Sequence, residues 1–308
     1  MRFNKLDLNL LVALDALLAE RSITLAAERL NLSPSALSNS LAKLRDYFDD
    51  DLLVQIGRKM EITPRAESLQ DAVRDVLLRI DSTIVAQPAF DPSKSDRVFR
   101  IFVSDYTQLV LGPALLKLAT EQHCTAQFDF LAQVVNPQRE LERGDADLII
   151  IPSGFASPDH PSETLYDEEF VCVVWSDSHL AQGELTFDRY VEAGHVVMRP
   201  STKGESFESW FLQRFGVTRR TTVTTYSFAA LPALVAGSDY IATVHARLAH
   251  RMAAAWPLTI RPAPIVIDRM DQAVQWHRYR TQDPGLVWLR KTLHRAAAHM
   301  DQMHLPPT

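Results

Sequence analysis

The chain has 308 residues, which is long for one domain and sufficient for two or three. Hydrophobic residues make up 46% of the chain and charged residues 23%, which are ordinary values for a soluble protein. The formal net charge is −6, and residues 1–66 carry nine basic and nine acidic side chains. This balance excludes a strongly basic nucleic-acid-binding domain, so any contact with DNA must come from local clustering of positive charge.

The cysteine content and the N-terminus bear on the cellular compartment. Cys124 and Cys172 are far apart and form no CxxC motif, so we expect no disulfide framework and a reducing, cytoplasmic location. The N-terminus lacks the apolar run and small-residue cleavage site of a signal peptide. No stretch approaches about 18 consecutive apolar residues, so we predict no membrane span.

Two helices are predicted at the start of the chain. Leucines recur at helical spacing through residues 7–20, and Asp7 is a suitable N-cap. A shorter helix follows in "TLAAERL", residues 24–30, capped by Ser22 or Thr24.

A third helix is predicted in "SPSALSNSLAKLRDYF", with Ser33 as its N-cap and Pro34 at the first helical position. One side of this helix is apolar and comprises Leu37, Leu41, Leu44 and Phe48. The opposite side is short-chained and polar and comprises Ser35, Ser38, Asn39, Ala42 and Lys43. Such an outward face allows a broad polar partner to approach the helix backbone closely.

The segment "LLVQIGRKMEIT" contains two short β-prone runs around Gly57, Arg58 and Lys59, which predicts a hairpin with a basic tip. Together these elements predict a winged helix-turn-helix whose third helix enters the DNA major groove. The side chains expected to contact phosphates are Lys43, Arg45, Arg58, Lys59 and Arg65. The alternative is an ordinary three-helix subdomain with a solvated polar face.

The stretch from "DLNLLVALDALLAE" to "TPRAESL", residues 7–69, resembles the N-terminal domain of LysR-type transcriptional regulators. The motifs that carry the resemblance are "SPSALS", "LAKLR" and "TPRAE". The family usually has Gln-Pro after the capping serine, whereas this chain has Pro34 and Ser35. Base reading is therefore expected from Ser35, Ser38 and Asn39.

A long helix is predicted from residue 64 to residue 86. Leu69, Val73, Val76 and Ile80 form a short heptad-like seam. This seam packs either on the chain's own domain or, as the resemblance implies, on the same helix of a second copy. The residues after it, "QPAFDPSKSDR", predict a linker.

The rest of the chain alternates short β-branched or aromatic runs with helical patterns. The predicted strands are "VFRIFVS", "AQFDFLA", "DLIIIP", "FVCVVW", "HVVM", "TVTTYS" and "YIATV". Helical patterns such as "TQLVLGPALLKLATEQ" and "SFESWFLQRFG" lie between them. The alternation predicts an α/β fold of parallel sheets flanked by helices.

The resemblance extends to this part through "LERGDADLIII" and "ALVAGSDYIATV". It implies two lobes of the periplasmic-binding-protein type, with a ligand between them and chain crossings near residues 168–171 and 265–267. The expected domains are a winged helix-turn-helix, a linker (dimerisation) helix and an effector-binding domain, at residues 1–63, 64–91 and 92–308. Lobe one would comprise residues 92–167 and 267–308, and lobe two residues 168–266.

No catalytic or cofactor motif stands out in the second half. GxGxxG after a strand, GxxxxGK[ST], HExxH and GxSxG are all absent. His245 and His250 are five residues apart, and no further ligands complete a metal site. We therefore expect no metal, no cofactor and no enzyme activity, although a dispersed Ser-His-Asp triad is not excluded by sequence.

A small-molecule site is the favoured interpretation, because ligands in such sheets settle at strand ends near helix N-termini. Two strand-to-helix junctions qualify, one at Ser104 and Thr107 and one at Ser201 and Thr202. The alternative for these hydroxyl residues is plain helix capping.

The segments "DLNLLVALDAL" and "QWHRYRTQDPGLVWLRKTL" resemble the subgroup of nodulation and aromatic-catabolism regulators, which implies aromatic acids, phenols or flavonoids as inducers. The aromatic side chains near the expected cleft are Phe170, Phe207, Tyr226 and Phe228. Glu169, His245 and Arg247 match positions near the hinge and cleft of that subgroup. Arg247 would pair with a carboxylate, whereas Glu169 in the cleft would favour a phenol.

Together, these observations predict a transcriptional regulator that binds double-stranded DNA and senses a small, aromatic effector. Its expected partners are a promoter or operator, RNA polymerase and further copies of itself in a dimer of dimers. Two alternatives remain open, an enzyme with an α/β substrate domain and an effector-independent regulator of the same family.

Overall fold

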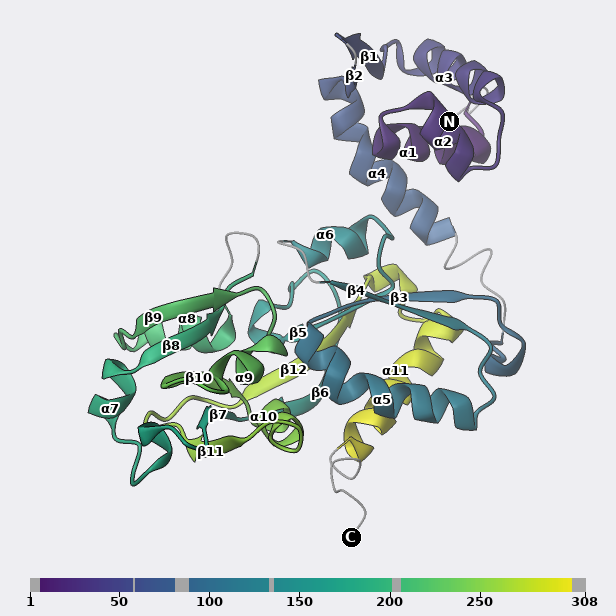
Figure 1. The fold of residues 1–308 in the computed structure, drawn as a ribbon. Helices are drawn as coiled ribbons and strands as arrows, with labels where there is room; N and C mark the ends of the chain where they lie inside the picture. The colour runs from purple at the N-terminus through teal and green to yellow at the C-terminus, as the bar shows by residue number, and fades with distance from the viewer. Residues whose placement is uncertain (1–5, 58, 81–88, 133–135, 201–205, 301–308) are drawn as a thin grey trace. The chain divides into compact units, whose positions relative to one another are not determined.

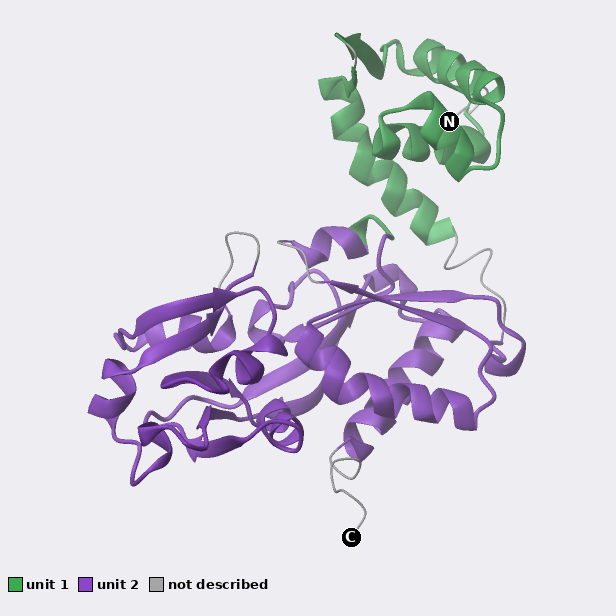
Figure 2. Cartoon of the chain, in the orientation of Figure 1, with its two compact units in different colours: residues 1–86, 142–144 green, residues 87–141, 145–308 purple. Residues whose placement is uncertain are grey.

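The computed structural model describes residues 6–57, 59–80, 89–132, 136–200 and 206–300 (Figure 1). The chain divides into two compact units, as Figure 2 shows. Unit 1 comprises residues 1–86 with 142–144, and unit 2 comprises residues 87–141 with 145–308.

Unit 1 begins with three helices at the predicted places. They are α1 (Leu8–Glu20), α2 (Ile23–Arg29) and α3 (Pro34–Phe48). Asp7 caps α1 by accepting a hydrogen bond of 2.9 Å from the Leu10 amide. Ser22 and Ser33 cap the next two helices, so the predicted helix starts are confirmed.

The predicted hairpin is also present, as strands β1 (Leu53–Ile56) and β2 (Lys59–Ile62) in antiparallel register. Asp50 fixes its base, because this carboxylate accepts hydrogen bonds from the Thr63 hydroxyl at 2.6 Å and the Leu52 amide at 2.7 Å. The Thr63 and Leu52 hydrogen bonds, in that order, hold the pKa of Asp50 below its usual value.

Helix α4 (Pro64–Ile80) packs on the leucine-rich core of unit 1. Val73 lies in that core at 6% exposure, and Leu69 packs against it. Half of the predicted seam is therefore used within the chain's own unit. Val76, by contrast, is 45% exposed. Arg74 on the same helix also pairs with Asp15 of α1 at 3.2 Å.

Unit 2 contains two five-stranded sheets. The first has the strand order β4-β3-β5-β12-β6, with β3 parallel to both β4 and β5, and β12 antiparallel to both β5 and β6. Its strands are β3 (Val98–Val103), β4 (Gln127–Ala132), β5 (Leu148–Pro152), β6 (Ser162–Glu168) and β12 (Met270–Trp276). Helices α5 (Asp105–Glu121) and α11 (Pro284–His299) contribute to one core with this sheet. Figure 1 shows them close together.

The second sheet has the order β11-β7-β10-β8-β9, with β10 parallel to β8 and antiparallel to β7. Its strands are β7 (Phe170–Trp175), β8 (Gly194–Met198), β9 (Arg220–Thr225), β10 (Tyr240–His245) and β11 (Leu258–Pro262). The other helices of unit 2 are α6 (Pro137–Glu142), α7 (Phe187–Glu192), α8 (Phe207–Arg214), α9 (Ala230–Val235) and α10 (Ala246–Ala253). Short 3₁₀ turns occur at Pro92–Lys94, Ser153–Phe155, His179–Ala181 and Arg278–Arg280.

The chain passes between the two sheets twice, once from β6 to β7 and once from β11 to β12. All seven strands predicted from sequence are present, and the two-lobed α/β architecture is confirmed. The expectation of parallel sheets is wrong, because β7 and β12 run antiparallel to their neighbours. Strands β6, β11 and β12 were not predicted. Within the described ranges, no helix is long and apolar enough to cross a membrane.

A buried ionic cluster joins three elements of the first sheet's lobe. Asp283 caps α11 by accepting from the Leu286 amide at 3.1 Å, and Arg97 binds both of its carboxylate oxygens at 2.6 and 2.9 Å. Arg280 bridges Asp283 at 3.1 Å and Asp147 at 2.6 Å. Burial alone would raise the pKa of Asp283, but hydrogen bonds and charge from the two arginines hold it below 3.8.

We predict that Asp283→Asn lowers the free energy of unfolding by about 3 kcal/mol at pH 7, because it leaves buried arginine charge uncompensated. The folded chain keeps Asp283 ionised below the pH at which the unfolded chain protonates it. The cost of the substitution is therefore full above about pH 4 and shrinks as the pH falls through the lowered pKa. Urea unfolding from pH 3 to pH 7 measures both effects.

The matched control is Asp129→Asn, which neutralises an exposed carboxylate on β4. It should leave the urea midpoint almost unchanged at every pH. Equal effects of the two substitutions would contradict the role assigned to the cluster.

Candidate functional site

The outward face of α3 is exposed as the sequence predicts. Ser33 caps the helix through the Ala36 amide at 3.2 Å, and Pro34 occupies the first helical position. The exposed residues along this face are Ser35, Ser38, Asn39, Ala42 and Lys43. Short side chains on a solvent-facing helix allow its backbone to approach the edges of bases in a groove.

The cations near this face have different environments. The guanidinium of Arg45 donates to the carbonyl oxygens of Asp51 and Leu53, both at 2.7 Å, and so holds the turn from α3 to β1. These contacts give Arg45 a structural role, and its role as a phosphate ligand stays a prediction. Lys59 is exposed at the start of β2. Arg58 lies outside the described residues.

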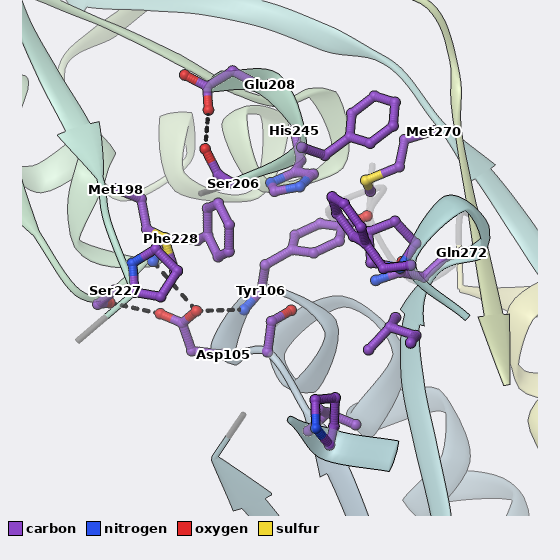
Figure 3. A pocket seen from close by; sticks show the side chains of 18 of the residues that line it. Asp105, Tyr106, Met198, Ser206, Glu208, Ser227, Phe228, His245, Met270 and Gln272 are labelled. Carbon is purple, nitrogen blue, oxygen red and sulfur yellow. Dashed lines mark hydrogen bonds between the residues drawn. The ribbon is translucent and has the colours of Figure 1, made fainter. Parts of the chain in front are cut away.

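Unit 2 contains a cavity of about 700 Å³ where strands of both sheets end. Figure 3 shows it from close by, with Tyr106, His245, Met270 and Gln272 gathered on one side and Met198, Ser227 and Phe228 on the other. Its described lining contains no lysine or arginine. The lining is Val103, Ser104, Asp105, Tyr106, Ala132, Pro137, Gln138, Ile151, Pro152, Phe155, Phe170, Met198, Pro200, Ser206, Phe207, Glu208, Tyr226, Ser227, Phe228, His245, Met270 and Gln272.

Aromatic rings from both lobes line much of this cavity. Phe170 and Phe207 stack with ring centroids 5.9 Å apart and planes at 11°. Tyr106 and His245 stack more closely, at 3.7 Å and 8°. Phe155 meets Phe207 edge-on at 6.5 Å. Flat rings held in this way offer apolar faces to a planar ligand.

The carboxylate of Asp105 joins the two sides of the cavity. Asp105 begins α5, directly after the first sheet's β3, and it accepts hydrogen bonds from the segment between β9 and α9. The donors are the Ser227 hydroxyl at 2.6 Å, the Phe228 amide at 3.2 Å and the Ala229 amide at 3.0 Å. Its charge is thus used to hold the lobes together rather than left free for a ligand (Figure 3).

A second buried network lies behind the Tyr106 ring. The Tyr106 hydroxyl donates to Glu168, and Arg247 pairs with Glu168 at 3.2 Å. Glu168 is only 1% exposed, and burial raises its pKa although Tyr106 and Arg247 oppose that shift. Burial is also the main cause that raises the pKa of Tyr106. Tyr106 therefore offers its ring to the cavity and its hydroxyl to the protein.

His245 is neutral in this environment. It is 3% exposed, and burial lowers its pKa from 6.5 to about 3. Its Nδ1 atom is buried without a hydrogen-bond partner in the described structure. Glu208, the other acidic residue of the lining besides Asp105, pairs with Arg219 at 2.5 Å and accepts a hydrogen bond from Ser206.

The residues predicted from sequence as effector contacts fall into three groups. Those that line the cavity are Ser104, Phe207, Phe228 and His245. Those that do not line it are Thr107, Glu169 and Arg247. Thr107 is buried and its hydroxyl accepts from Gln272, Glu169 is exposed and pairs with Arg269, and Arg247 pairs with Glu168. Ser201 and Thr202 lie outside the described residues.

Sequence reasoning missed Tyr106, Met270 and Gln272 as cavity residues. Two of them belong to β12, a strand that was not predicted. The segment "MDQAVQW" gives only a weak strand signal, because Asp271 and Gln275 as well as Gln272 are polar. A polar side chain at such a position is buried and needs a partner.

Comparisons with known proteins identify both units. Residues 8–67 match the family model for the bacterial regulatory helix-turn-helix protein of the lysR family, and residues 93–298 match the LysR substrate binding domain. The chain is 39% identical over 312 residues to nodulation protein D 2 of Rhizobium leguminosarum bv. phaseoli, covering 99% of this chain and 96% of that protein. It is 40% identical to nodulation protein D 1 of Mesorhizobium japonicum over 301 residues, covering 97% and 96%.

Solved structures agree with the fold. A probable transcriptional regulator from Pseudomonas aeruginosa has a TM-score of 0.65 at 26% identity, over 94% of this chain and 96% of that one. Full-length OxyR from the same organism, in variant form, has a TM-score of 0.72 at 18% identity, over 95% and 94%. CbnR, solved in complex with its target DNA, has a TM-score of 0.51 at 17% identity, over 95% and 100%. The chain belongs to the LysR family and is a LysR-type transcriptional regulator, with an N-terminal helix-turn-helix and a C-terminal effector-binding domain.

Proposed function

We propose that this regulator binds an operator through the outward face of α3 and responds to an aromatic effector held in the cavity of unit 2. The observation that carries the effector proposal is the aromatic lining of that cavity, to which both lobes contribute rings. We further propose a cytoplasmic protein without catalytic activity, which contacts RNA polymerase at its promoter. Transcription in vitro with purified polymerase and an operator template tests that contact.

The DNA proposal rests on exposure and side-chain length. Ser35, Ser38 and Asn39 present short polar groups to solvent, where they can reach base edges in the major groove. Lys43 and Lys59 carry the exposed positive charge that suits phosphates. Arg45 acts indirectly, because it fixes the start of the wing.

The assembly proposal is a dimer of dimers with α4 in one interface. Leu69 and Val73 are used by the core of unit 1, so the available apolar surface of this helix is its later part. Val76 is exposed there, and Ile80 is half-buried at the end of the described helix. An exposed valine on this helix is a suitable contact for a second copy of the helix.

The effector proposal rests on shape and polarity. The Phe170–Phe207 and Tyr106–His245 stacks contact each other, with the Phe170 and His245 ring centroids 5.0 Å apart, and a planar molecule lying against them would touch residues of both lobes. Because Asp105 bridges the same two sides, occupation of the cavity and closure of the lobes are coupled. A ligand that binds one arrangement better shifts the population toward it, and with it the arrangement of the oligomer on DNA.

For DNA, we predict that Asn39→Ala weakens operator binding by about 1–3 kcal/mol and reduces discrimination against random DNA, because a base contact is lost. Lys59→Ala should weaken both DNAs alike and lower the salt slope by about 1. Fluorescence anisotropy at several salt concentrations measures both.

Ser40→Ala is the control, because its hydroxyl already binds the Ala36 carbonyl within α3. An unchanged operator preference in Asn39→Ala would refute this recognition face.

For assembly, we predict that Val76→Asp shifts the oligomer toward smaller species, because an unpaired charge would be placed in an interface. Multi-angle light scattering measures the mass. Ser68→Asp adds the same charge to an exposed site two turns earlier and should leave the mass unchanged. If Val76→Asp has no effect either, the interface does not involve this part of α4.

For the effector, we predict that phenols, aromatic acids or flavonoids raise the melting temperature of the full chain, whereas sugars and amino acids do not. A ligand at a hundred times its Kd stabilises the folded state by about 2.7 kcal/mol. Phe207→Ala should reduce the shift by removing a stacked ring. Phe187→Ala, an exposed phenylalanine outside the lining, should retain it.

A response to sugars or amino acids alone would overturn the aromatic assignment. No response to any class would favour the effector-independent regulator. A stabilising compound should also change operator affinity in the anisotropy titration, and an unaltered affinity would remove the proposed coupling.

A further inference from the structure

A carboxylate of lobe one, which contains the first sheet, is held by three donors of lobe two, which contains the second. Asp105, the first residue of α5, accepts hydrogen bonds from the Ser227 hydroxyl at 2.6 Å and from the Phe228 and Ala229 amides at 3.2 and 3.0 Å (Figure 3). A fourth hydrogen bond, from the Tyr106 amide at 3.0 Å, stays within lobe one. Every group in this contact belongs to the chain itself, so the contact forms without an effector. Asp105 together with residues 227–229 is called the interlobe latch below.

Both halves of the interlobe latch lie on local structure that is fixed by other bonds. Ser104 is the N-cap of α5, because its hydroxyl accepts a hydrogen bond from the Thr107 amide at 3.1 Å. In lobe two, the Ser227 hydroxyl accepts from the Ala230 amide at 3.1 Å, which fixes the donors at the start of α9. Helix α5 therefore keeps its cap when the Asp105 carboxylate is removed, and such a variant tests the contact between the lobes.

A second set of polar contacts joins the lobes where the chain crosses from β6 to β7. The Ala246 amide donates to the Glu169 carbonyl oxygen at 2.8 Å, and Arg247 pairs with Glu168 at 3.2 Å. Because Glu168 and Glu169 are at the crossing itself, a rotation of the lobes about the crossings moves these contacts little. The interlobe latch lies on neither crossing, so the same rotation separates its two halves.

The exposure of the two carboxylates indicates which contact opens more readily. Glu168 is 1% exposed, so the loss of its partners would leave a buried charge, which is strongly unfavourable. Asp105 and its three donors are half-buried, so water replaces their hydrogen bonds when the lobes separate. Opening the interlobe latch therefore costs less free energy than breaking the contacts of Glu168.

The direction of its bonds makes the interlobe latch selective for one arrangement of the lobes. Beside it, the rings of Tyr106 in lobe one and Phe228 in lobe two both contact His245, at centroid distances of 3.7 and 4.9 Å. Contacts between rings are satisfied in several offset geometries, whereas hydrogen bonds weaken steeply when they are misaligned. A carboxylate with three donors from the other lobe therefore fixes an arrangement that the rings alone leave adjustable.

We propose that the interlobe latch is an autoinhibitory contact, which holds the lobes in one arrangement when no effector is bound. Opening it changes operator binding even without an effector, because the lobe arrangement and the DNA-binding unit are coupled. This inference rests on the coupling put forward under the proposed function. It adds the residues that maintain the effector-free arrangement.

The first measurement is hydrogen exchange of the full-length protein without an effector, resolved to single amides by electron-transfer fragmentation. In Ser227→Ala, the Phe228 and Ala229 amides keep Asp105 as their acceptor but lose the shortest bond beside them. Both amides should exchange at least about threefold faster, because the lobes separate more often. The Ala246 amide, which bonds Glu169 at the crossing, should keep its wild-type rate.

The second measurement is operator affinity without an effector, by fluorescence anisotropy. Asp105→Ala removes the acceptor of all three bonds between the lobes, so its affinity should differ from that of the wild type by at least about threefold. Ser227→Ala should change the affinity in the same direction by a smaller factor. The control is Glu121→Ala, which removes an exposed carboxylate at the other end of α5 and should change neither exchange nor affinity.

Wild-type exchange of the Phe228 and Ala229 amides in Ser227→Ala would show that the three bonds act independently, and would overturn the interlobe latch. Equally faster exchange of the Ala246 amide would indicate a general loosening of unit 2 and would overturn it as well. Wild-type operator affinity in both Ser227→Ala and Asp105→Ala would overturn the autoinhibitory role, and Ser227→Ala decides the matter alone if Asp105→Ala is unstable. Because no effector is used, these results are distinguishable from a failure of the effector proposal, which the thermal-shift panel tests.

Discussion

Charged side chains that are buried or half-buried around the cavity of unit 2 need partners, because removing an ionised group from water without one costs far more than a fold can supply. Asp105 meets this requirement with donors from the opposite lobe, and Glu168 meets it with Tyr106 and Arg247. These contacts hold the cavity walls in place, and they leave neither carboxylate unpaired. The same hydrogen bonds and ion pair connect the two lobes, so the contacts that satisfy these charges also hold the lobes together.

Unit 1 follows the same requirement, because several of its charged side chains bond other parts of the unit and so fix the positions of its helices and its wing. Arg74 pairs with Asp15, which ties α4 to α1. Arg45 binds two carbonyl oxygens at the start of the wing. The face of α3 is left with short, uncharged side chains and one lysine. Short, uncharged side chains let a helix approach a groove closely, and phosphate contacts come from charged side chains.

Local rules explain which parts of this structure were predictable from sequence. The helix starts at Asp7, Ser22 and Ser33 depend on a side chain bonding an amide three residues on, and that relation is written in consecutive residues. The seven predicted strands have long β-branched or aromatic runs. Strand β6 was missed because "SETLYDE" is mostly polar, and its place in the sheet is set by pairing with the distant β12.

The site was less predictable because its roles depend on non-local pairs. Arg247 has the sequence context of a ligand-binding arginine, but its partner is Glu168, 79 residues earlier. Glu169 pairs with Arg269, 100 residues later. Val73 has the spacing of an intermolecular seam, but α1 lies close enough to bury it. In each case the sequence shows which interactions a side chain can make, and the fold determines the neighbour with which it makes them.

Glu168 and Gln272 show how differently a charged and a neutral side chain are accommodated in one buried region. Both side chains are almost fully buried and lie near the ring of Tyr106, but only the charged one has all its needs met within the protein. A neutral amide can be left with one open acceptor at a tolerable cost, whereas an ion cannot. The walls of a cavity that must stay folded when empty are therefore expected to keep their ions paired. His245 follows the same rule, because burial lowers its pKa to about 3 and keeps its imidazole uncharged at neutral pH.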